Sequence, residues 1–210
     1  MESVSRATQV KRYVQKKLVL LQKGPHSGET KALLANLRRG IGRIPGDSPE
    51  LWGMLLQDLP EEMQSKNGTP TREEWAVYIA LTLFAMHQQG YDPETRCMSK
   101  EGESLGEAVR KLVPTGDDAS MERIRRRFNA LATSLDMQEA AYHLRGIIQL
   151  LRTAGIPLDY PALAADLYNY QFPEGAQRVR LLWGQSFYHV SEQTENVQTV
   201  QDAGKEDSNE

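Results

Sequence analysis

Hydrophobic positions in this chain recur every three to four residues, a spacing typical of amphipathic helices. The most informative stretch covers residues 120–155 and predicts two consecutive helices. Ser120 and Asp136 are expected to cap them, and Gly155 to end the second, because glycine adopts the left-handed backbone conformation easily. The apolar stripes of the two helices are Met121, Ile124, Phe128, Leu131 and Leu135, then Met137, Ala141, Leu144, Ile148 and Leu151.

Seven further stretches show a helical pattern. They cover about 5–23, 27–39, 71–89, 104–113 and 161–170, and two more begin at Ser48 and Phe172. The stretch at 71–89 is the most apolar and is expected at the centre of the core. We also expect Trp52, Leu56 and Leu182 to point inward. His87 is expected to complement the dipole at a helix C-terminus.

No run of alternating β-branched residues predicts a strand. We therefore expect an all-α protein with about nine helices in two small helical bundles, at residues 1–103 and 104–190. Residues 191–210 have no apolar period and are expected to form a disordered acidic tail.

The net charge of −3 hides a strong separation of charges along the chain. The last 20 residues carry six acids and one lysine, so the other 190 residues are net positive. Residues 1–45 alone carry ten lysines and arginines against Glu2 and Glu29. Such segregation is typical of proteins that bind polyanions.

Two groups of arginines stand out as candidate nucleic-acid contacts. One surrounds a predicted helix end and a glycine-rich turn, and the other lies on the two helices of 120–155, where few acids are available to pair with it. Arginine can grip phosphate with two donors, and an exposed tyrosine can stack on an unpaired base. The alternative is that these cations only complement a helix dipole or form a solvated face. The candidates are Arg38, Arg39, Arg43, Arg123, Arg126, Arg127, Tyr142, Arg145 and Arg152.

Signals for catalysis are weak. The four histidines are far apart, Cys97 is the only cysteine, and Asp117-Asp118 reads as a turn before a helix. The chain also lacks phosphate-binding and nucleophile-elbow motifs. We expect no enzyme activity, no metal and no cofactor. The lack of a long apolar stretch and the single cysteine predict a cytoplasmic protein without a membrane span.

The order of several short segments resembles the CasB family, the small subunit of the type I-E CRISPR interference complex Cascade. The match covers roughly residues 30–190. The segments are Leu37-Arg38-Arg39-Gly40, Pro49-x-Leu51-Trp52, Glu74-Trp75-Ala76-Val77-Tyr78, Ser104-Leu105-Gly106, Arg127-Phe128, His143-Leu144-Arg145, Leu150-Leu151-Arg152, Gly155-Ile156-Pro157-Leu158-Asp159-Tyr160, Leu163-Ala164, Asp166-Leu167 and Trp183-Gly184-Gln185-Ser186-Phe187-Tyr188.

This resemblance implies a non-catalytic helical subunit that works in antiviral defence. Family members are present in two copies per complex, beside the other Cascade subunits, the crRNA and the unwound target DNA. The basic residues named above would then hold nucleic acid through its phosphate backbone. Two alternatives stay open: a helical protein–protein adaptor whose basic patches are incidental, and a hydrolase whose acids meet only in the fold.

Overall fold

The computed structural model describes residues 4–23 and 28–189 and is all-α, as predicted. Its α-helices are α1 Arg6–Lys23, α2 Gly28–Arg39, α3 Trp52–Leu56, α4 Arg72–His87, α5 Leu105–Arg110, α6 Asp118–Ala132, α7 Met137–Ala154, α8 Tyr160–Tyr170 and α9 Pro173–Tyr188. Two 3-10 turns, η1 Pro49–Leu51 and η2 Glu61–Met63, flank α3. An isolated bridge between Ser99 and Leu158 is the only β-type pairing in the described residues.

Helix α4 is central, as its composition predicted. Every side chain from Ala76 to His87 is buried, because α1, α2, α7 and α8 surround the helix. A capping box fixes its start: Thr71 Oγ1 accepts from the Glu74 N–H, and the Glu74 carboxylate accepts from the Thr71 N–H.

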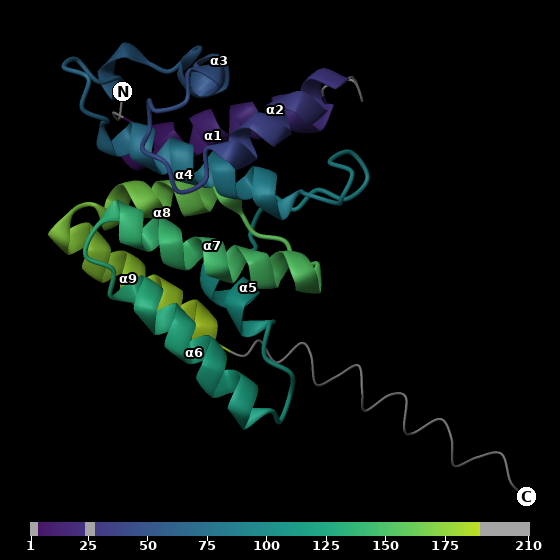
Figure 1. The fold of residues 1–210 in the computed structure, drawn as a ribbon. Helices are drawn as coiled ribbons and strands as arrows, with labels where there is room; N and C mark the ends of the chain where they lie inside the picture. The colour runs from purple at the N-terminus through teal and green to yellow at the C-terminus, as the bar shows by residue number, and fades with distance from the viewer. Residues whose placement is uncertain (1–3, 24–27, 190–210) are drawn as a thin grey trace, which may run out of the picture.

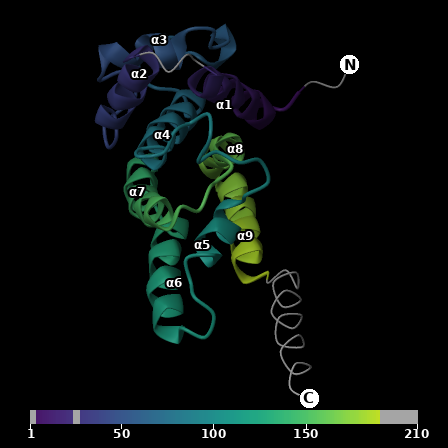
Figure 2. The same cartoon turned by 90° about the vertical axis from the view of Figure 1, so that its right-hand side faces the viewer.

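Helices α5 to α9 extend the fold away from α4 on the side opposite α2 and α3 (Figure 1). Helix α7 lies between α4 and α6, and α8 connects α1 and α4 to α9. Figure 2 shows the two resulting columns, with α2, α4, α7 and α6 in one and α1, α8 and α9 in the other. The first column carries most of the predicted basic residues.

The buried hydrophobic residues form one continuous cluster from Val10 to Phe187. Tyr160 of α8 packs edge-on against Phe84 of α4, with ring centroids 5.4 Å apart. Phe128 of α6 packs against Phe187 of α9 at 5.2 Å. The division into bundles at residues 103 and 104 stays a prediction, and the tail at 191–210 lies outside the described residues.

Most helix boundaries agree closely with the sequence pattern. The helix expected from Ser48 begins as the 3-10 turn η1, the one expected over 104–113 ends at Arg110, and the cap of α6 differs. Its N-cap is Asp117, whose carboxylate accepts from the Ser120 N–H at 2.9 Å, so the prediction that Ser120 caps this helix is wrong. The helix starts earlier because an ionised carboxylate is a strong acceptor for free N–H groups. Asp136 caps α7, and Gly155 ends it at φ 65°, both as predicted.

Several side chains that were expected inside lie on the surface. Leu135 is 94% exposed because α6 ends at Ala132, so the periodic stripe cannot continue to it. Trp52, Leu56 and Leu182 are 50%, 40% and 52% exposed. Ala141 is half-buried at the edge of the α7 core face.

His87 is fully buried, and its Nδ1 lies 3.1 Å from the Tyr160 hydroxyl. Burial lowers the pKa of His87 to about 4, so the ring is neutral at pH 7. The prediction that it complements a helix dipole as a cation is therefore wrong.

Candidate nucleic-acid interface

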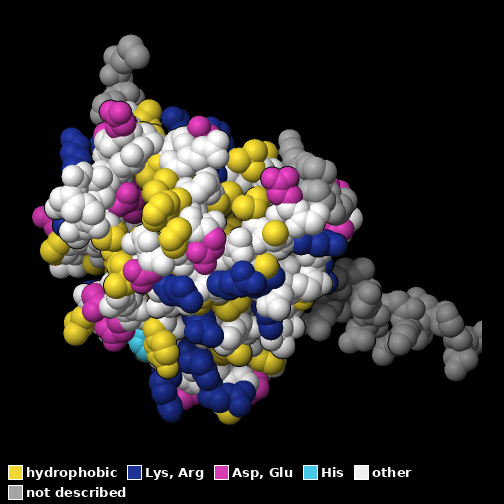
Figure 3. Space-filling model, turned by 45° about the horizontal axis from the view of Figure 1, so that its top comes forward, with side chains coloured by type: hydrophobic (Ala, Val, Ile, Leu, Met, Phe, Trp, Pro, Cys, Tyr) yellow, Lys and Arg dark blue, Asp and Glu magenta, His cyan; other side chains and the backbone are white. Residues whose placement is uncertain are grey.

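The predicted basic residues lie along the column formed by α2, α4, α7 and α6. Lys and Arg side chains gather across the middle and lower part of the face that Figure 3 shows. Arg38 and Arg39 end α2, and Arg43 lies in the loop after it. Arg123, Arg126 and Arg127 belong to α6, whereas Tyr142, Arg145 and Arg152 belong to α7.

Arg127 and Arg145 meet across a groove between α6 and α7. This α6–α7 groove has a volume of about 320 Å³ and is lined by Arg127, Tyr142, His143, Arg145, Gly146, Ile147 and Gln149. Neither arginine forms an ion pair within the described residues. Two free guanidiniums therefore face the same open groove.

Tyr142 presents its ring beside these cations. The side chain is 73% exposed, and its ring centroid lies 5.3 Å from that of His143 in an edge-on arrangement. His143 Nε2 lies 3.8 Å from Glu139 Oε1, on the side of α7 nearer its N-terminus. One face of the tyrosine ring is thus available next to positive charge, the combination on which unpaired bases stack.

Arg43 approaches α7 from the opposite side. It lines a small cavity of about 40 Å³ together with Trp75 of α4 and with Gln138 and Ala141 of α7. Its Nη1 donates to Ser48 Oγ at 3.4 Å, and the residue is exposed. Helix α7 therefore has an exposed arginine without an ion pair in the described residues on each flank, Arg43 on one side and Arg127 on the other.

The other arginines of α2 and α7 are partly engaged. Arg38 donates to the Ala85 carbonyl at 3.4 Å, and burial lowers the pKa of its guanidinium. Arg152 donates to Gln89 Oε1 at 2.8 Å, which joins the ends of α7 and α4. Arg39 is exposed and donates to Asn36 Oδ1 at 3.1 Å. Arg38 and Arg152 thus contribute to the fold as well as to surface charge.

The expectation that few acids pair with the α6 arginines is wrong for two of them. Glu122 forms ion pairs with Arg125 and, at 3.7 Å, with Arg126. Arg123 donates to Ser120 Oγ at 2.6 Å, and the same hydroxyl contacts the Asp117 carboxylate. Glu122 lies three and four residues before these arginines, so one helical turn brings it beside Arg125 and Arg126.

Sequence reasoning missed three residues that line the groove, His143, Gly146 and Ile147. The sequence presents His143 as one of four separated histidines and as part of a family segment, and its position next to Tyr142 places it on the groove wall. Gly146 leaves room above α7: Nη1 of Arg127 lies 3.7 Å from the position that a Cβ there would take. The sequence does contain one indication of this space, because Gly146 directly follows Arg145 within an otherwise regular helix.

Within the described residues, no helix is long and apolar enough to cross a bilayer, and no group of three or more histidine, cysteine or acidic side chains is arranged to hold a metal ion.

Comparison with known proteins gives the family. A family model for CRISPR-associated protein Cse2 matches residues 33–188. The crystal structure of CasB from Thermobifida fusca superposes with a TM-score of 0.69 and 35% sequence identity, covering 89% of this chain and all of that one. No curated protein sequence matches.

Two more distant structures share the fold. CasB from M. ruber has 22% identity and a TM-score of 0.59, covering 94% of this chain and 99% of that one. A CRISPR-associated protein of the Cse2 family from Thermus thermophilus has 20% identity and a TM-score of 0.59, covering 88% and 99%. The profile match over most of the chain and the T. fusca structure agree with the motifs quoted above. The chain therefore belongs to the Cse2 (CasB) family, the small subunit of the CRISPR interference complex Cascade.

Proposed function

We propose that this Cascade subunit holds unwound target DNA by its phosphates along the outer face of α7. The observation that carries the proposal is the α6–α7 groove, where Arg127 and Arg145 have no ion-pair partner in the described residues and Tyr142 is exposed beside them. Free guanidiniums bind phosphate oxygens through two parallel donors, and the ring offers a surface on which a base can stack.

The arrangement suits single strands better than sequence-specific reading of a duplex. Helix α7 is packed on both flanks, by α4 and by α6, so it cannot enter a major groove as a recognition helix does. Contacts to phosphates are independent of sequence. In guided DNA recognition, base pairing supplies the specificity, and backbone contacts shift a nearly balanced strand exchange. A subunit of this kind would favour the opened state for any target.

We assign the subunit no catalytic step of its own, in keeping with a family of structural subunits. The other Cascade subunits, the crRNA and a second copy of this chain are its proposed partners. Two copies on one scaffold would raise the effective concentration of the basic face near the strand. An isolated copy would therefore bind DNA more weakly than the assembled pair.

The test uses the assembled complex and scores target-strand opening at several salt concentrations. Arg43→Ala, Arg127→Ala and Arg145→Ala should each weaken opening for every target sequence alike. Removing one phosphate-binding arginine should also flatten the logarithmic salt slope by about 0.7, the value per phosphate for single strands.

Arg125→Ala is the matched control, because Arg125 is an exposed α6 arginine already paired with Glu122. It should leave opening and its salt slope unchanged. If the triple variant opens DNA with the wild-type slope, the α7 face is not the holding surface, and an adaptor role becomes the better account.

A further inference from the structure

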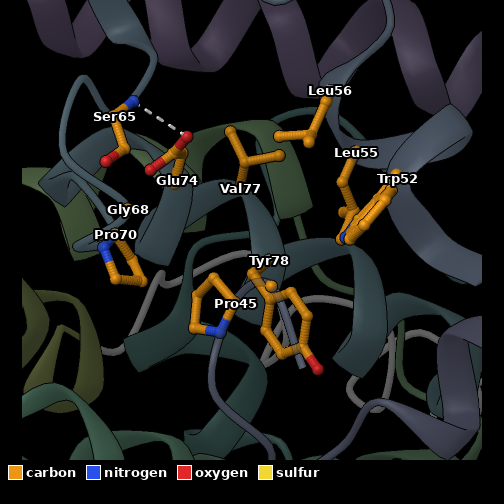
Figure 4. Close-up of a pocket in the computed structure, with 11 residues that line it drawn as sticks. Pro45, Trp52, Leu55, Leu56, Ser65, Gly68, Pro70, Glu74, Val77 and Tyr78 are labelled. Carbon is orange, nitrogen blue, oxygen red and sulfur yellow. Dashed lines mark hydrogen bonds between the residues drawn. The ribbon is translucent and has the colours of Figure 1, made fainter. Parts of the chain in front are cut away.

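A second surface, between α3 and α4, has the features of a protein-docking pocket. It is an apolar hollow of about 110 Å³ between α3, the loop before α4, and α4 itself. Figure 4 shows Pro45 and Pro70 on its loops, Leu55 and Trp52 of α3 on one wall, and Val77 at its base. The volume is well below that of a typical site for a whole small-molecule ligand, so the hollow suits one large side chain.

The side chains at the mouth of this pocket are apolar and exposed. Trp52 is 50% exposed, Leu56 40%, and Ile44, just before Pro45, 39%. The helical pattern predicted Trp52 and Leu56 in the core, yet nothing in the described chain covers them. An exposed apolar patch around a preformed hollow is typical of an interaction site, and tryptophan is prominent among residues that dominate binding energy.

The Glu74 carboxylate and the Tyr78 hydroxyl in the pocket wall already have partners, and the Tyr78 hydroxyl donates to the Gly40 carbonyl at 2.6 Å. Glu74 Oε1 accepts from the Ser65 N–H at 3.1 Å, as the dashed line in Figure 4 marks, and Oε2 accepts from the Thr71 N–H at 2.7 Å. The carboxylate thus closes the start of α4 instead of offering a free acceptor. The group that enters the pocket should therefore be apolar.

The surroundings of the pocket are acidic. Residues 44–74 carry seven carboxylates against Lys66 and Arg72. Four of the seven are used within the fold: Glu62 and Glu73 pair with Arg6, Asp58 pairs with Lys16, and Glu74 closes α4.

Asp47, Glu50 and Glu61 are exposed and have no ion pair within the described residues. In Figure 3, where the top of Figure 1 comes forward, hydrophobic side chains group in the upper part with acidic ones around them. Such a surface repels phosphates, which rules against nucleic acid, and attracts a cationic partner.

We propose that this pocket anchors another protein subunit through a segment in which one large apolar side chain is flanked by lysine or arginine. The apolar side chain fills the hollow beside Trp52, and the flanking cations face Asp47, Glu50 and Glu61. The inference uses membership in a multi-subunit complex and does not depend on DNA being held at α7.

The test measures binding of the full chain to fluorescent twelve-residue peptides by anisotropy, at low and at high salt. The panel has one core pattern, Lys-Φ-x-Lys with Φ leucine, isoleucine or phenylalanine. Its counterparts replace the two lysines with glutamates or Φ with serine. The lysine peptides with an apolar Φ should bind at least about tenfold more tightly than either counterpart, and more weakly at high salt.

Trp52→Ala and Leu56→Ser should each weaken this binding by about tenfold or more. Leu182→Ser is the matched control, because Leu182 is a comparably exposed leucine on α9, and it should change nothing. Glu50→Lys should weaken the lysine peptides and strengthen the glutamate ones. Reconstituted complex containing Leu56→Ser should also lose the small subunit more readily, as native mass spectrometry would show.

Three results would overturn the proposal. Equal binding of lysine and glutamate peptides would show that Asp47, Glu50 and Glu61 do not select a cationic partner. A loss of single-stranded DNA binding in Trp52→Ala as large as that in Arg127→Ala would assign the pocket to nucleic acid. Self-association of the wild type that disappears in Leu56→Ser would make a second copy of the chain the occupant. A negative result in the peptide measurements would leave the proposal for α7 unaffected, because the DNA measurements test that proposal separately.

Discussion

Arg127 and Gly146 face each other across the α6–α7 groove: Nη1 of Arg127 lies 3.7 Å from the position that a Cβ on Gly146 would take. That distance is an ordinary van der Waals contact, so alanine fits without moving the arginine. A longer acidic side chain at the same position would instead meet the guanidinium and neutralise it.

Substitutions at Gly146 can therefore test the effect of the groove's charge on DNA binding separately from the effect of its shape. Gly146→Ala should raise the free energy of unfolding by about 0.5–1 kcal/mol, because glycine within a helix is costly, and should leave DNA binding unchanged. Gly146→Glu should weaken single-stranded DNA binding about as much as Arg127→Ala does. Thermal unfolding and salt-dependent DNA titrations of both variants provide the measurement. Equal weakening by alanine and glutamate would mean that the open shape, not the charge, governs binding.

Gly106 is required by the close approach of α5 to α9. A methyl group at this position would overlap Ser186 Oγ and the Trp183 carbonyl and lie 2.7 Å from the Phe187 nitrogen. Two of these atoms are backbone, so the clash cannot be relieved by a change of rotamer. Gly106→Ala should therefore lower the free energy of unfolding by about 1–3 kcal/mol, measured by urea denaturation. Gly184→Ala on α9 is the control, since no atom lies within 4 Å of a Cβ there; an equal loss in both variants would contradict the packing argument.

The hydroxyl of Tyr170 secures the end of α6. Its oxygen lies 3.2, 3.0 and 3.2 Å from the carbonyl oxygens of Leu131, Ala132 and Ser134, and it accepts from Arg180 at 3.3 Å. Tyr170→Phe should cost about 1–2 kcal/mol of unfolding free energy, because the buried helix-end carbonyls lose their donor. Tyr188→Phe, with a ring 63% exposed, should have no measurable effect. Stability of Tyr170→Phe equal to wild type would show that water replaces the hydroxyl.

The helices were predictable because their local signals agree. At α4 and α7 the capping residues, the apolar periods and the end signals all predict the same boundaries. At α6 the pattern predicts Ser120 as the capping residue, whereas the structure has Asp117. Gly106 is part of a family segment, but the sequence does not show why a glycine is required there. The atoms that would clash with a side chain at this position belong to α9, some 80 residues later.

Only the part of the site that depends on a single helix was predictable from the sequence. Periodicity predicts Tyr142, Arg145, Gln149 and Arg152 on one ridge of α7, since this is a property of a single helix, and the first three line the groove. It cannot show that Arg127 of α6 and Arg43 of the α2–α3 loop flank that ridge, which depends on how helices pack. It also cannot distinguish an inward tryptophan from an exposed one, so the pattern predicts Trp52 in the core although the side chain is 50% exposed.

His87 and Asp166 should make opposing contributions to the pH dependence of stability. Burial lowers the pKa of His87 to about 4, below its unfolded value of about 6.5. Between these values the unfolded chain binds a proton that the folded chain does not, so acidification destabilises the fold. Burial raises the pKa of Asp166 to about 6, above its ordinary value of 3.8, despite a hydrogen bond of 2.8 Å from Trp183 Nε1. Here the folded chain binds the extra proton, so acidification over that range stabilises the fold.

Each contribution reaches about 3 kcal/mol, so in the wild type the two largely cancel between about pH 6 and pH 4. Asp166→Asn removes one of them while an amide oxygen still accepts from Trp183. At pH 7 the variant should be more stable than wild type, because it no longer buries a charge. As the pH falls from about 6.5 to about 4.5, its free energy of unfolding should decrease steeply while that of the wild type changes little. Urea denaturation across this range measures both, and parallel curves for the two proteins would show that Asp166 does not carry the opposing proton.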